Sequence, residues 1–304
     1  MKKLIALLIT LAGFVSAVTA EPLKPEKINE TVFALIGEIG GRTYENQGLN
    51  ANYGVIVTND GVILIDSGAS KQGAALIDKQ VQNLTGKKVK WVINTGSQDH
   101  RWLGNEYFIS QGAEVIALNK TVTTQKQLTS TQLDSVKAVL KDRFNGTKPA
   151  YAQKPINQNN AELNLGGTKV QIKYLNHAHF EGDVVIYLPE QNIMFSGDHI
   201  YVDRLLGVLP QSNATTWLDA FTKIESINPK VIVPGHGSVC NLPKAKNQTG
   251  DYLKFLVDGA KKYAEDMAGV ENAVKGLTSA PQFEKLANFN ELHRGNISRT
   301  YLRL

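Results

Sequence analysis

Metal-binding side chains follow strand-like runs at five places in this 304-residue chain. They are Asp66, Asp99 with His100, His177 with His179, Asp198 with His199, and His236. Each run is short, apolar and rich in β-branched residues, which is typical of buried β-strands. A lone histidine usually has only a structural partner, but five of the six histidines lie in these stretches. Because strand ends on one edge of a sheet converge and functional loops gather there, we expect a metal site at such an edge.

The rest of the pattern alternates strands with helices. Strands are predicted at 32–36, 53–57, 62–65, 89–93, 115–118, 170–175, 184–188, 193–195 and 231–233. Helices are predicted at 69–84, 103–111, 121–144, 217–227, 251–274 and, as a helix or an extended arm, 289–304. An Asn-Asp-Gly turn at 59–61 joins two of the strands as a hairpin. Two rounds of strands followed by helices predict a layered α/β fold.

The N-terminal segment MKKLIALLITLAGFVSAVTA has the layout of a secretory signal peptide. Two lysines precede an apolar stretch over 4–15, and small residues precede a cleavage site expected before Glu21. A membrane anchor is the alternative, but this stretch is short for the ~20 residues that span a bilayer. We therefore expect a signal peptide at 1–20, a main domain at 21–250, and a C-terminal helical extension at 251–304 packed on the same domain.

The net charge limits the classes of partner that are expected, and the cysteine content limits the possible disulfides. Cleavage of the signal peptide removes Lys2 and Lys3 and no acid, so the formal net charge falls from +5 to +3. The basic residues are scattered, which argues against a nucleic-acid partner. Cys240 is the only cysteine, so no intramolecular disulfide can form, and we expect it to act as a buried small hydrophobe. We expect a protein of the periplasm, or a secreted one, that acts on a small-molecule substrate without stable membrane insertion.

Five sequence segments, taken in their order along the chain, are the most informative about fold and function. They are NYGVIV…GVILIDSG (52–68), NTGSQDHRWLGN (94–105), HAHFEGDVVIYLPE (177–190), FSGD (195–198) and VPGHG (233–237). In this order they resemble the metallo-β-lactamase superfamily. The resemblance spans most of residues 30–240 and implies an αββα four-layer sandwich with a metal site on the shared edge of its two sheets.

The resemblance also implies a set of metal ligands. In the family, a His-x-His-x-Asp-His loop supplies two ligands to a first metal and its Asp-His pair to a second. By this pattern, Asp99, His100, Asp198 and His236 form a complete second site. His179 matches the remaining histidine of the first site, and Asp66 matches a carboxylate that fixes the ligand loop.

The ligand loop departs from the family pattern. Counted back from Asp99, the first two histidine positions hold Thr95 and Ser97. With one residue deleted in the loop, they hold Gly96 and Gln98 instead. Both registers remove two imidazoles of the first site, so we expect one intact metal site and one degraded site.

The expected cofactor is one divalent metal. Two carboxylates and two imidazoles suit Zn²⁺, and also Fe or Mn, and a second metal stays open. Such a metal activates a bound water for attack on an ester, thioester, amide or lactam bond. Asp99 and His179 are the expected catalytic residues, with His179 as proton shuttle or substrate polariser. Two carboxylate ligands would make the site anionic, which holds the metal firmly but weakens it as a Lewis acid.

Three alternatives stand beside this hypothesis. His177 and His179 could form a displaced pair that holds a second metal with Gln98, although we favour an orienting role for His177. The missing histidines also suit an accessory or binding protein of the same fold with a structural metal. Iron-dependent oxidation of a sulfur compound ranks lowest, because relatives with that activity use the first site.

Overall fold

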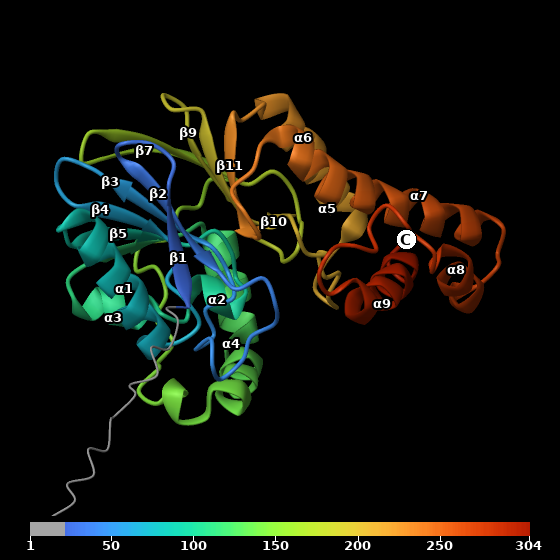
Figure 1. Cartoon of the computed structure of the whole chain (residues 1–304), viewed down its shortest axis with the longest axis horizontal. Coiled ribbons are helices and arrows are strands. Elements are labelled where there is room, and N and C mark those ends of the chain that lie inside the picture. Colours follow the sequence, from blue (N-terminus) through green and yellow to red (C-terminus); the bar gives the residue numbers. More distant parts are fainter. Residues whose placement is uncertain (1–21) are drawn as a thin grey trace, which may run out of the picture.

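Two mixed β-sheets form the centre of the molecule. In the computed structural model of the protein, residues 22–304 are described. The first sheet contains, in spatial order, β1 (Leu23–Lys27), β2 (Val32–Gly37), β3 (Tyr53–Val57), β4 (Val62–Ile65), β5 (Val89–Ile93) and β6 (Glu114–Ile116). The second contains, in spatial order, β11 (Val231–His236), β10 (Ile193–Tyr201), β9 (Val185–Leu188), β8 (Thr168–Lys173) and β7 (Asn160–Leu165). Figure 1 shows the strands of both sheets grouped together.

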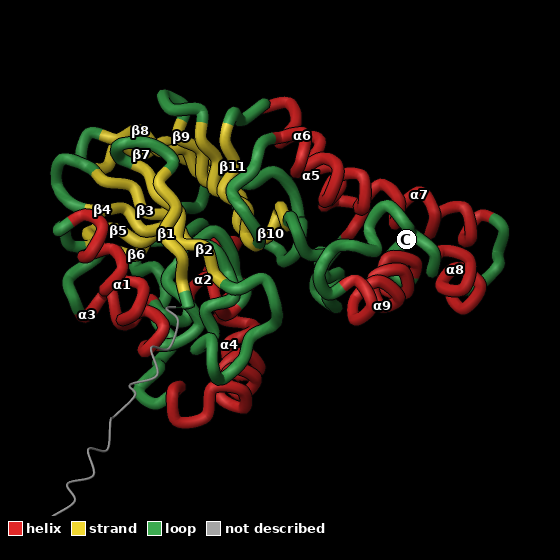
Figure 2. Tube along the Cα trace, in the orientation of Figure 1, coloured by secondary structure: helices red, strands yellow, loops and turns green. Residues whose placement is uncertain are grey.

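Helices cover the outer faces of both sheets (Figure 2). Those that follow strands of the first sheet are α1 (Lys71–Thr85), α2 (Asp99–Trp102), α3 (Asn105–Ser110) and α4 (Asn119–Leu140), continued by a 3₁₀ turn over Lys141–Phe144. Those that follow strands of the second sheet are α5 (Ala214–Ile227), α6 (Leu242–Ala245), a π turn over Lys246–Gly250, α7 (Asp251–Glu265), α8 (Val270–Leu277) and α9 (Phe289–Tyr301). Helix α1 begins where the Ser70 side chain accepts a hydrogen bond from the Gly73 amide, as N-cap serines do.

Three hydrophobic clusters hold these layers together. Between the sheets, residues such as Ile63 of β4 pack with residues such as Phe195 of β10. On the outer face of the first sheet, Leu64 packs with Ile77 of α1. On the outer face of the second, Met194 packs with α5 and the C-terminal helices. Alternate residues of each strand thus face opposite layers, one toward the other sheet and one toward the helices. The layers follow the order helix, sheet, sheet, helix, which confirms the predicted αββα four-layer sandwich.

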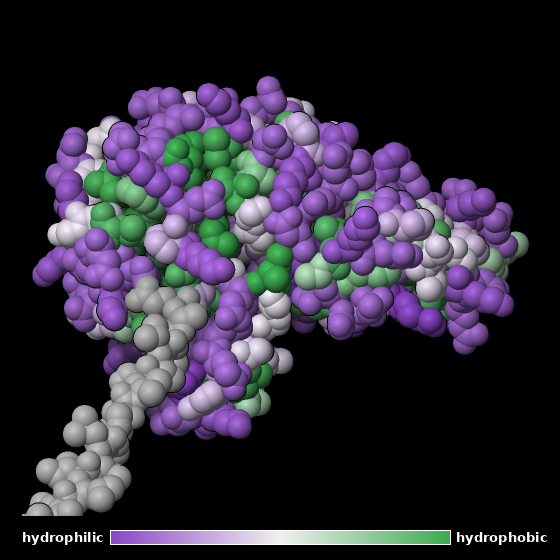
Figure 3. Space-filling view, viewed as in Figure 1, coloured by the Kyte–Doolittle hydropathy of each residue, from purple (hydrophilic) through white to green (hydrophobic). Residues whose placement is uncertain are grey.

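The C-terminal helices α7, α8 and α9 extend beyond the sheets (Figure 1). They share one hydrophobic cluster with α5 and the second sheet, in which Tyr252 and Ile297 are buried together with Trp217. Cys240 belongs to the same cluster, which confirms its prediction as a small buried hydrophobe. In the view of Figure 3 the surface is mostly hydrophilic, and its apolar areas are small and interrupted.

The structure corrects one strand boundary that affects the site. The sequence predicts a strand at 193–195 that ends before Asp198, whereas β10 continues to Tyr201 with Asp198 inside it. Its pairing with β11 shifts between Phe195 and Gly197 and again before Tyr201. Such bulges re-aim side chains, so Asp198 reaches the sheet edge from within a strand. Strands β1 and β7 were not predicted, because their exposed, charged residues lack an apolar run.

The predicted signal peptide at 1–20 lies outside the described residues. Within residues 22–304, no helix is both long enough and apolar enough to cross a bilayer.

Candidate metal centre

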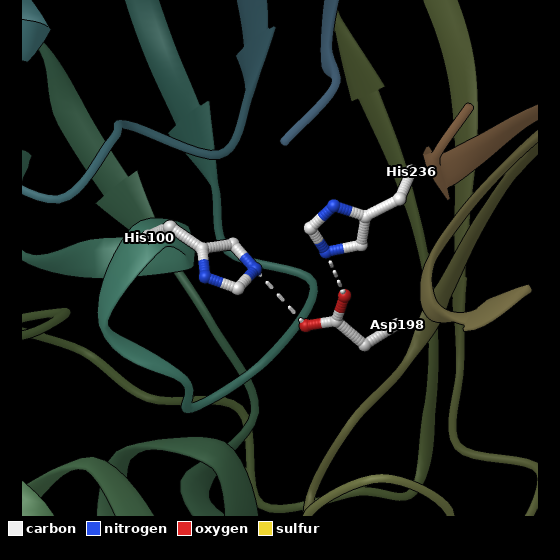
Figure 4. A group of neighbouring side chains, drawn as sticks. All are labelled: His100, Asp198 and His236. Atoms are coloured by element: carbon white, nitrogen blue, oxygen red, sulfur yellow. Dashed lines mark ion pairs between the residues drawn. The ribbon is translucent and has the colours of Figure 1, made fainter. Parts of the chain in front are cut away.

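Three buried side chains from distant parts of the chain meet at the sheet edge. They are His100 of α2, Asp198 of β10 and His236 at the end of β11, and one ligand atom from each lies within 4.8 Å of the other two (Figure 4). The His100 Nε2 and His236 Nε2 atoms are each 3.3 Å from a different oxygen of Asp198. All three side chains are at most 3% exposed. Two imidazoles and a carboxylate so placed form a candidate site for a divalent metal.

The His236 ring is oriented by a backbone carbonyl. Its Nδ1 atom lies 2.7 Å from the carbonyl oxygen of Asn50, so Nδ1–H donates and Nε2 keeps its lone pair. Arg204 also approaches Nδ1, at 3.3 Å, but a guanidinium cannot donate to a nitrogen that carries a proton, so the Asn50 contact fixes the tautomer. Burial holds the pKa of His236 well below its usual value, so the ring is neutral. This is the form that binds metals.

His100 is presented by a short, firmly anchored helix. Its neighbour Trp102 is fully buried and donates from Nε1 to the Ser97 carbonyl and to Gln132, which ties α2 to the ligand loop and to α4. Neither ring nitrogen of His100 has a hydrogen-bond partner of good geometry among the described residues. A buried imidazole that points both nitrogens at carboxylates without bonding either suits a position that binds a metal.

Asp99 stands apart from the three-residue group. Both of its oxygens are bonded to the Arg42 guanidinium, which comes from the loop between β2 and β3. Its Oδ1 atom lies 3.3 Å from Nδ1 of His100, on the side of the ring away from Asp198. Burial would raise the pKa of Asp99, but Arg42 and His100 outweigh it and lower the pKa. The geometry therefore places Asp99 where a carboxylate orients a histidine ligand, and does not bring it among the candidate ligands.

Arg101 is fully buried next to the three-residue group and contacts Asp198. Its side chain is 1% exposed, and it donates to both oxygens of Asp198, at 2.6 and 3.0 Å, and to Asp66 Oδ2 at 3.1 Å. The remaining donors reach the carbonyl oxygens of Asn52 and Gly235. A Cβ on Gly235 would lie 2.7 Å from this guanidinium, so only glycine allows the approach. One arginine thus joins the ends of strands from both sheets.

These ion pairs offset part of the negative charge expected at the site. Burial would raise the pKa of Asp198, but Arg101 outweighs it and holds the pKa well below its ordinary value. The carboxylate is therefore charged, and Arg101, which also pairs with Asp66, compensates part of that charge. Arg42 compensates Asp99 in the same way. Sequence reasoning counted the acids but not the arginines that face them.

The structure favours one of the two registers of the ligand loop. The Gln98 Oε1 atom lies 2.9 Å from Nε2 of His179, where a first-site ligand would be. Thr95 instead donates to Asp66 from both its amide and its hydroxyl, each at 2.7 Å. The Gln98–His179 contact favours the register in which Gly96 and Gln98 take the two missing histidine positions. With the one-residue deletion of that register, Asp99 and His100 keep the positions of the family's Asp-His pair.

His179 lies in the same pocket but outside the three-residue group. Its Nδ1 atom lies 3.3 Å from the hydroxyl of Ser212, opposite the Gln98 contact. Burial lowers the pKa of His179 to about 4, so the ring is neutral near pH 7. Its predicted roles as a metal ligand and as a catalytic residue stay predictions.

His177 and His199 do not contribute ligands to this group. The Nε2 atom of His177 lies 2.7 Å from the Gln211 carbonyl oxygen, and its Nδ1 atom lies 3.3 Å from Glu181. The structure therefore does not bring His177 to Gln98 as a displaced pair. His199 is fully buried, with Nδ1 3.1 Å from the Ser196 carbonyl, as expected for a packing residue.

A pocket of about 250 Å³ opens onto the group. Its polar lining includes Arg42, Gln98, His100, His179, Arg204 and His236. Arg204 donates to the Gly40 carbonyl at 3.1 Å, and its buried Nε atom has no partner among the described residues. Burial lowers the pKa of Arg204 from its usual value, although Tyr201 and Asp198 oppose the shift. Arg204 is thus a cation that lines the pocket. Its acidic neighbour, Asp198, is already paired with Arg101.

Sequence analysis missed the importance of Arg42 and Arg101. Arg101 had a usable signal, because it directly follows the Asp-His pair of the candidate ligand loop. A charged residue in such a loop is almost never fully buried unless it is paired. Arg42 gave no such signal, because it lies in a polar loop far from Asp99 in the sequence.

The family model of the metallo-beta-lactamase superfamily matches residues 46–236, which is more than half of the chain and contains the whole three-residue group. The chain belongs to this superfamily. Metallo-beta-lactamase type 2 of Elizabethkingia meningoseptica is 27% identical over 220 residues, which cover 70% of this chain and 78% of the relative. Metallo-beta-lactamase IND-1 of Chryseobacterium indologenes is 27% identical over 219 residues, which cover 70% of this chain and 80% of the relative.

Solved structures of metallo-beta-lactamases share the fold. The enzyme from Pontibacter korlensis aligns with a TM-score of 0.63 at 20% identity, covering 76% of this chain and 99% of the other. VMB-1 aligns with a TM-score of 0.60 at 20% identity, covering 77% and 98%. Superfamily membership and the curated relatives support a metal-dependent hydrolase and leave its substrate open.

Proposed function

We propose that the protein is an exported hydrolase that uses a single metal ion, Zn²⁺ by preference, held by His100, Asp198 and His236. The observation that carries the proposal is the meeting of these three buried side chains, with the His100 and His236 nitrogens 3.3 Å from Asp198 oxygens. Ligand atoms bound to zinc at ~2.0–2.1 Å with tetrahedral angles lie ~3.3–3.4 Å apart. Each imidazole has this spacing to one Asp198 oxygen, and the three ligand atoms lie within 4.8 Å of one another, so the donor set suits the ion once the side chains close around it.

We assign a separate role in catalysis to each of the residues around the three-residue group. When bound, the metal lowers the pKa of a water molecule and polarises the substrate carbonyl. The Asn50 carbonyl orients the His236 ring through a hydrogen bond, and the Asp99 carboxylate flanks the His100 ring, with Oδ1 3.3 Å from Nδ1. A pKa of about 4 makes His179 a weak base, so we assign it to polarising the substrate rather than to shuttling protons, with the substrate replacing Gln98 Oε1 as the acceptor of the Nε2–H group. An ester, thioester, amide or lactam is the proposed substrate class.

The test is metal content together with turnover. Protein purified from its export compartment should carry one equivalent of metal and should hydrolyse a member of a panel of esters, thioesters and lactams. Removal of the metal with a chelator should abolish turnover, and added Zn²⁺ should restore it. Metal-loaded protein that is inert towards the whole panel would contradict hydrolysis.

One observation favours a second candidate, an accessory or binding protein of this fold. Gly96 and Gln98 replace two imidazoles, and Arg101 already compensates Asp198, so the group could persist without chemistry. In that case metal would bind without any turnover, and ligand-site variants would change only thermal stability or binding.

Replacing Asp99 with Asn should weaken metal binding without removing the site. The substitution takes away the carboxylate beside His100, and loss of such an orienting group typically costs about 10–100-fold in metal affinity. One equivalent should still bind at saturation, as measured by titration against a chelating dye. The matched control is Asp258→Asn on α7, whose side chain is 55% exposed and which should bind as the wild type does. A variant that binds no metal at saturation would restore Asp99 as a ligand.

Replacing Arg204 with Met should reduce binding of anionic substrates selectively. Its charge at the pocket has no acid of its own, and a charge-assisted hydrogen bond contributes about 1.5–3 kcal/mol, so KM for a carboxylate-bearing substrate should rise about 10- to 100-fold. KM for a neutral ester of similar size should stay within a few fold. Equal loss for both substrates would show that Arg204 shapes the pocket without recognising charge.

A further inference from the structure

Asp198 has little capacity left for a metal. A carboxylate offers about four lone-pair positions. Its Oδ1 atom accepts from Arg101 Nη2 and from the hydroxyl of Tyr201, at 2.6 and 3.0 Å. Its Oδ2 atom accepts from Arg101 Nε at 3.0 Å. The remaining position is on Oδ2, the oxygen that lies 3.3 Å from His100 Nε2.

Arg101 cannot move away to release more of Asp198. All five of its N–H groups are donated, to acceptors on four separate segments. These acceptors are Asn52 before β3, Asp66 after β4, Asp198 within β10 and Gly235 near the end of β11. The side chain is 1% exposed and has no route to solvent that keeps these bonds. Arginine stays protonated under all ordinary conditions. The positive charge that contacts Asp198 is therefore permanent.

We propose that Arg101 is a built-in cation that competes with the metal for Asp198, so that the site stays assembled without metal and binds the ion weakly enough to exchange it. This inference rests on the proposed metal centre. Two effects produce the competition. The bidentate pair draws electron density from the carboxylate, and the guanidinium repels a second cation in a buried site where screening is poor. Arg101 thereby positions the ligands in the absence of metal and sets the affinity for metal.

The test compares two variants that differ only at Arg101. Removing Arg101 alone would leave Asp66 buried without its cation, so both proteins carry Asp66→Asn, whose amide oxygen still accepts from the Thr95 amide. Zn²⁺ affinity is measured by competition with a chromophoric chelator, with circular dichroism to check folding. We expect D66N/R101M to bind Zn²⁺ about 10-fold more tightly than D66N. A residue that only supported the fold would give the opposite sign, because misplaced ligands bind more weakly.

A second measurement needs no substitution. Wild-type protein stripped of metal should unfold cooperatively, at a melting temperature within a few degrees of the Zn²⁺-loaded protein. Stripped protein that is unfolded would overturn the inference, and so would folded D66N/R101M with equal or weaker affinity, while the metal centre would stand in both cases. If neither the wild type nor any variant binds Zn²⁺, the proposed metal centre and this inference fail together. If D66N/R101M does not fold, the wild-type measurement decides.

Discussion

Replacing His236 with Ala should reduce turnover by about 10³-fold and abolish metal binding. The substitution removes one of the three candidate ligands, and its ring is the one that the Asn50 carbonyl holds in place. The two remaining ligands cannot hold the ion alone. Metal activation is worth several kcal/mol of transition-state stabilisation, and each 1.4 kcal/mol is about a factor of ten. The measurement is kcat/KM on the best substrate of the panel, with metal analysis of the same sample. The folded state should persist, because Arg101 and not the metal joins the strand ends.

His177→Ala is the matched control. His177 also lies in a ligand-like motif, but its ring contacts the Gln211 carbonyl and Glu181 and not the three-residue group. Turnover and metal content should match those of the wild type. A loss of metal from His177→Ala would show that the displaced pair with His179 does hold an ion, contrary to the geometry.

Replacing Asp66 with Ala should lower the free energy of unfolding by about 3–5 kcal/mol. Asp66 is 1% exposed and accepts from the Thr95 amide, the Thr95 hydroxyl and Arg101 Nη1. Its removal leaves three buried donors without an acceptor and takes one of two carboxylates from a buried guanidinium. Breaking a buried ion pair from one side typically costs this much, because the charge that remains is uncompensated. Urea unfolding of metal-free protein measures the effect without interference from metal binding.

Asp258→Ala provides the comparison for stability. Asp258 pairs with Lys254 on the exposed face of α7, where both side chains are more than half exposed. Such a pair contributes about 0.3–0.5 kcal/mol, so this variant should unfold almost as the wild type does. A loss of less than about 1 kcal/mol in Asp66→Ala would mean that Arg101 is satisfied by Asp198 alone.

The sequence determined the architecture and most of the candidate ligands. Alternating apolar runs predicted the β3–β4 hairpin, β5 and the helices α1 and α5, because burial on one face leaves a periodic trace in the sequence. The same strand-end pattern singled out His100, Asp198 and His236, which the structure brings together. Histidine and aspartate next to strand ends are visible locally, so their recognition required no three-dimensional information.

Only the tertiary structure decided how each charge is compensated. Asp99 and His100 are adjacent in the chain, yet the one faces Arg42 and the other faces Asp198. Arg101 pairs with two acids that precede and follow it by 35 and 97 residues. In a buried site the choice of ion pair depends on distances of a few ångströms between segments remote in sequence, because screening is weak and every unpaired charge is costly. Motif spacing carries no record of those distances, so the sequence supplied the donors while the fold assigned their partners.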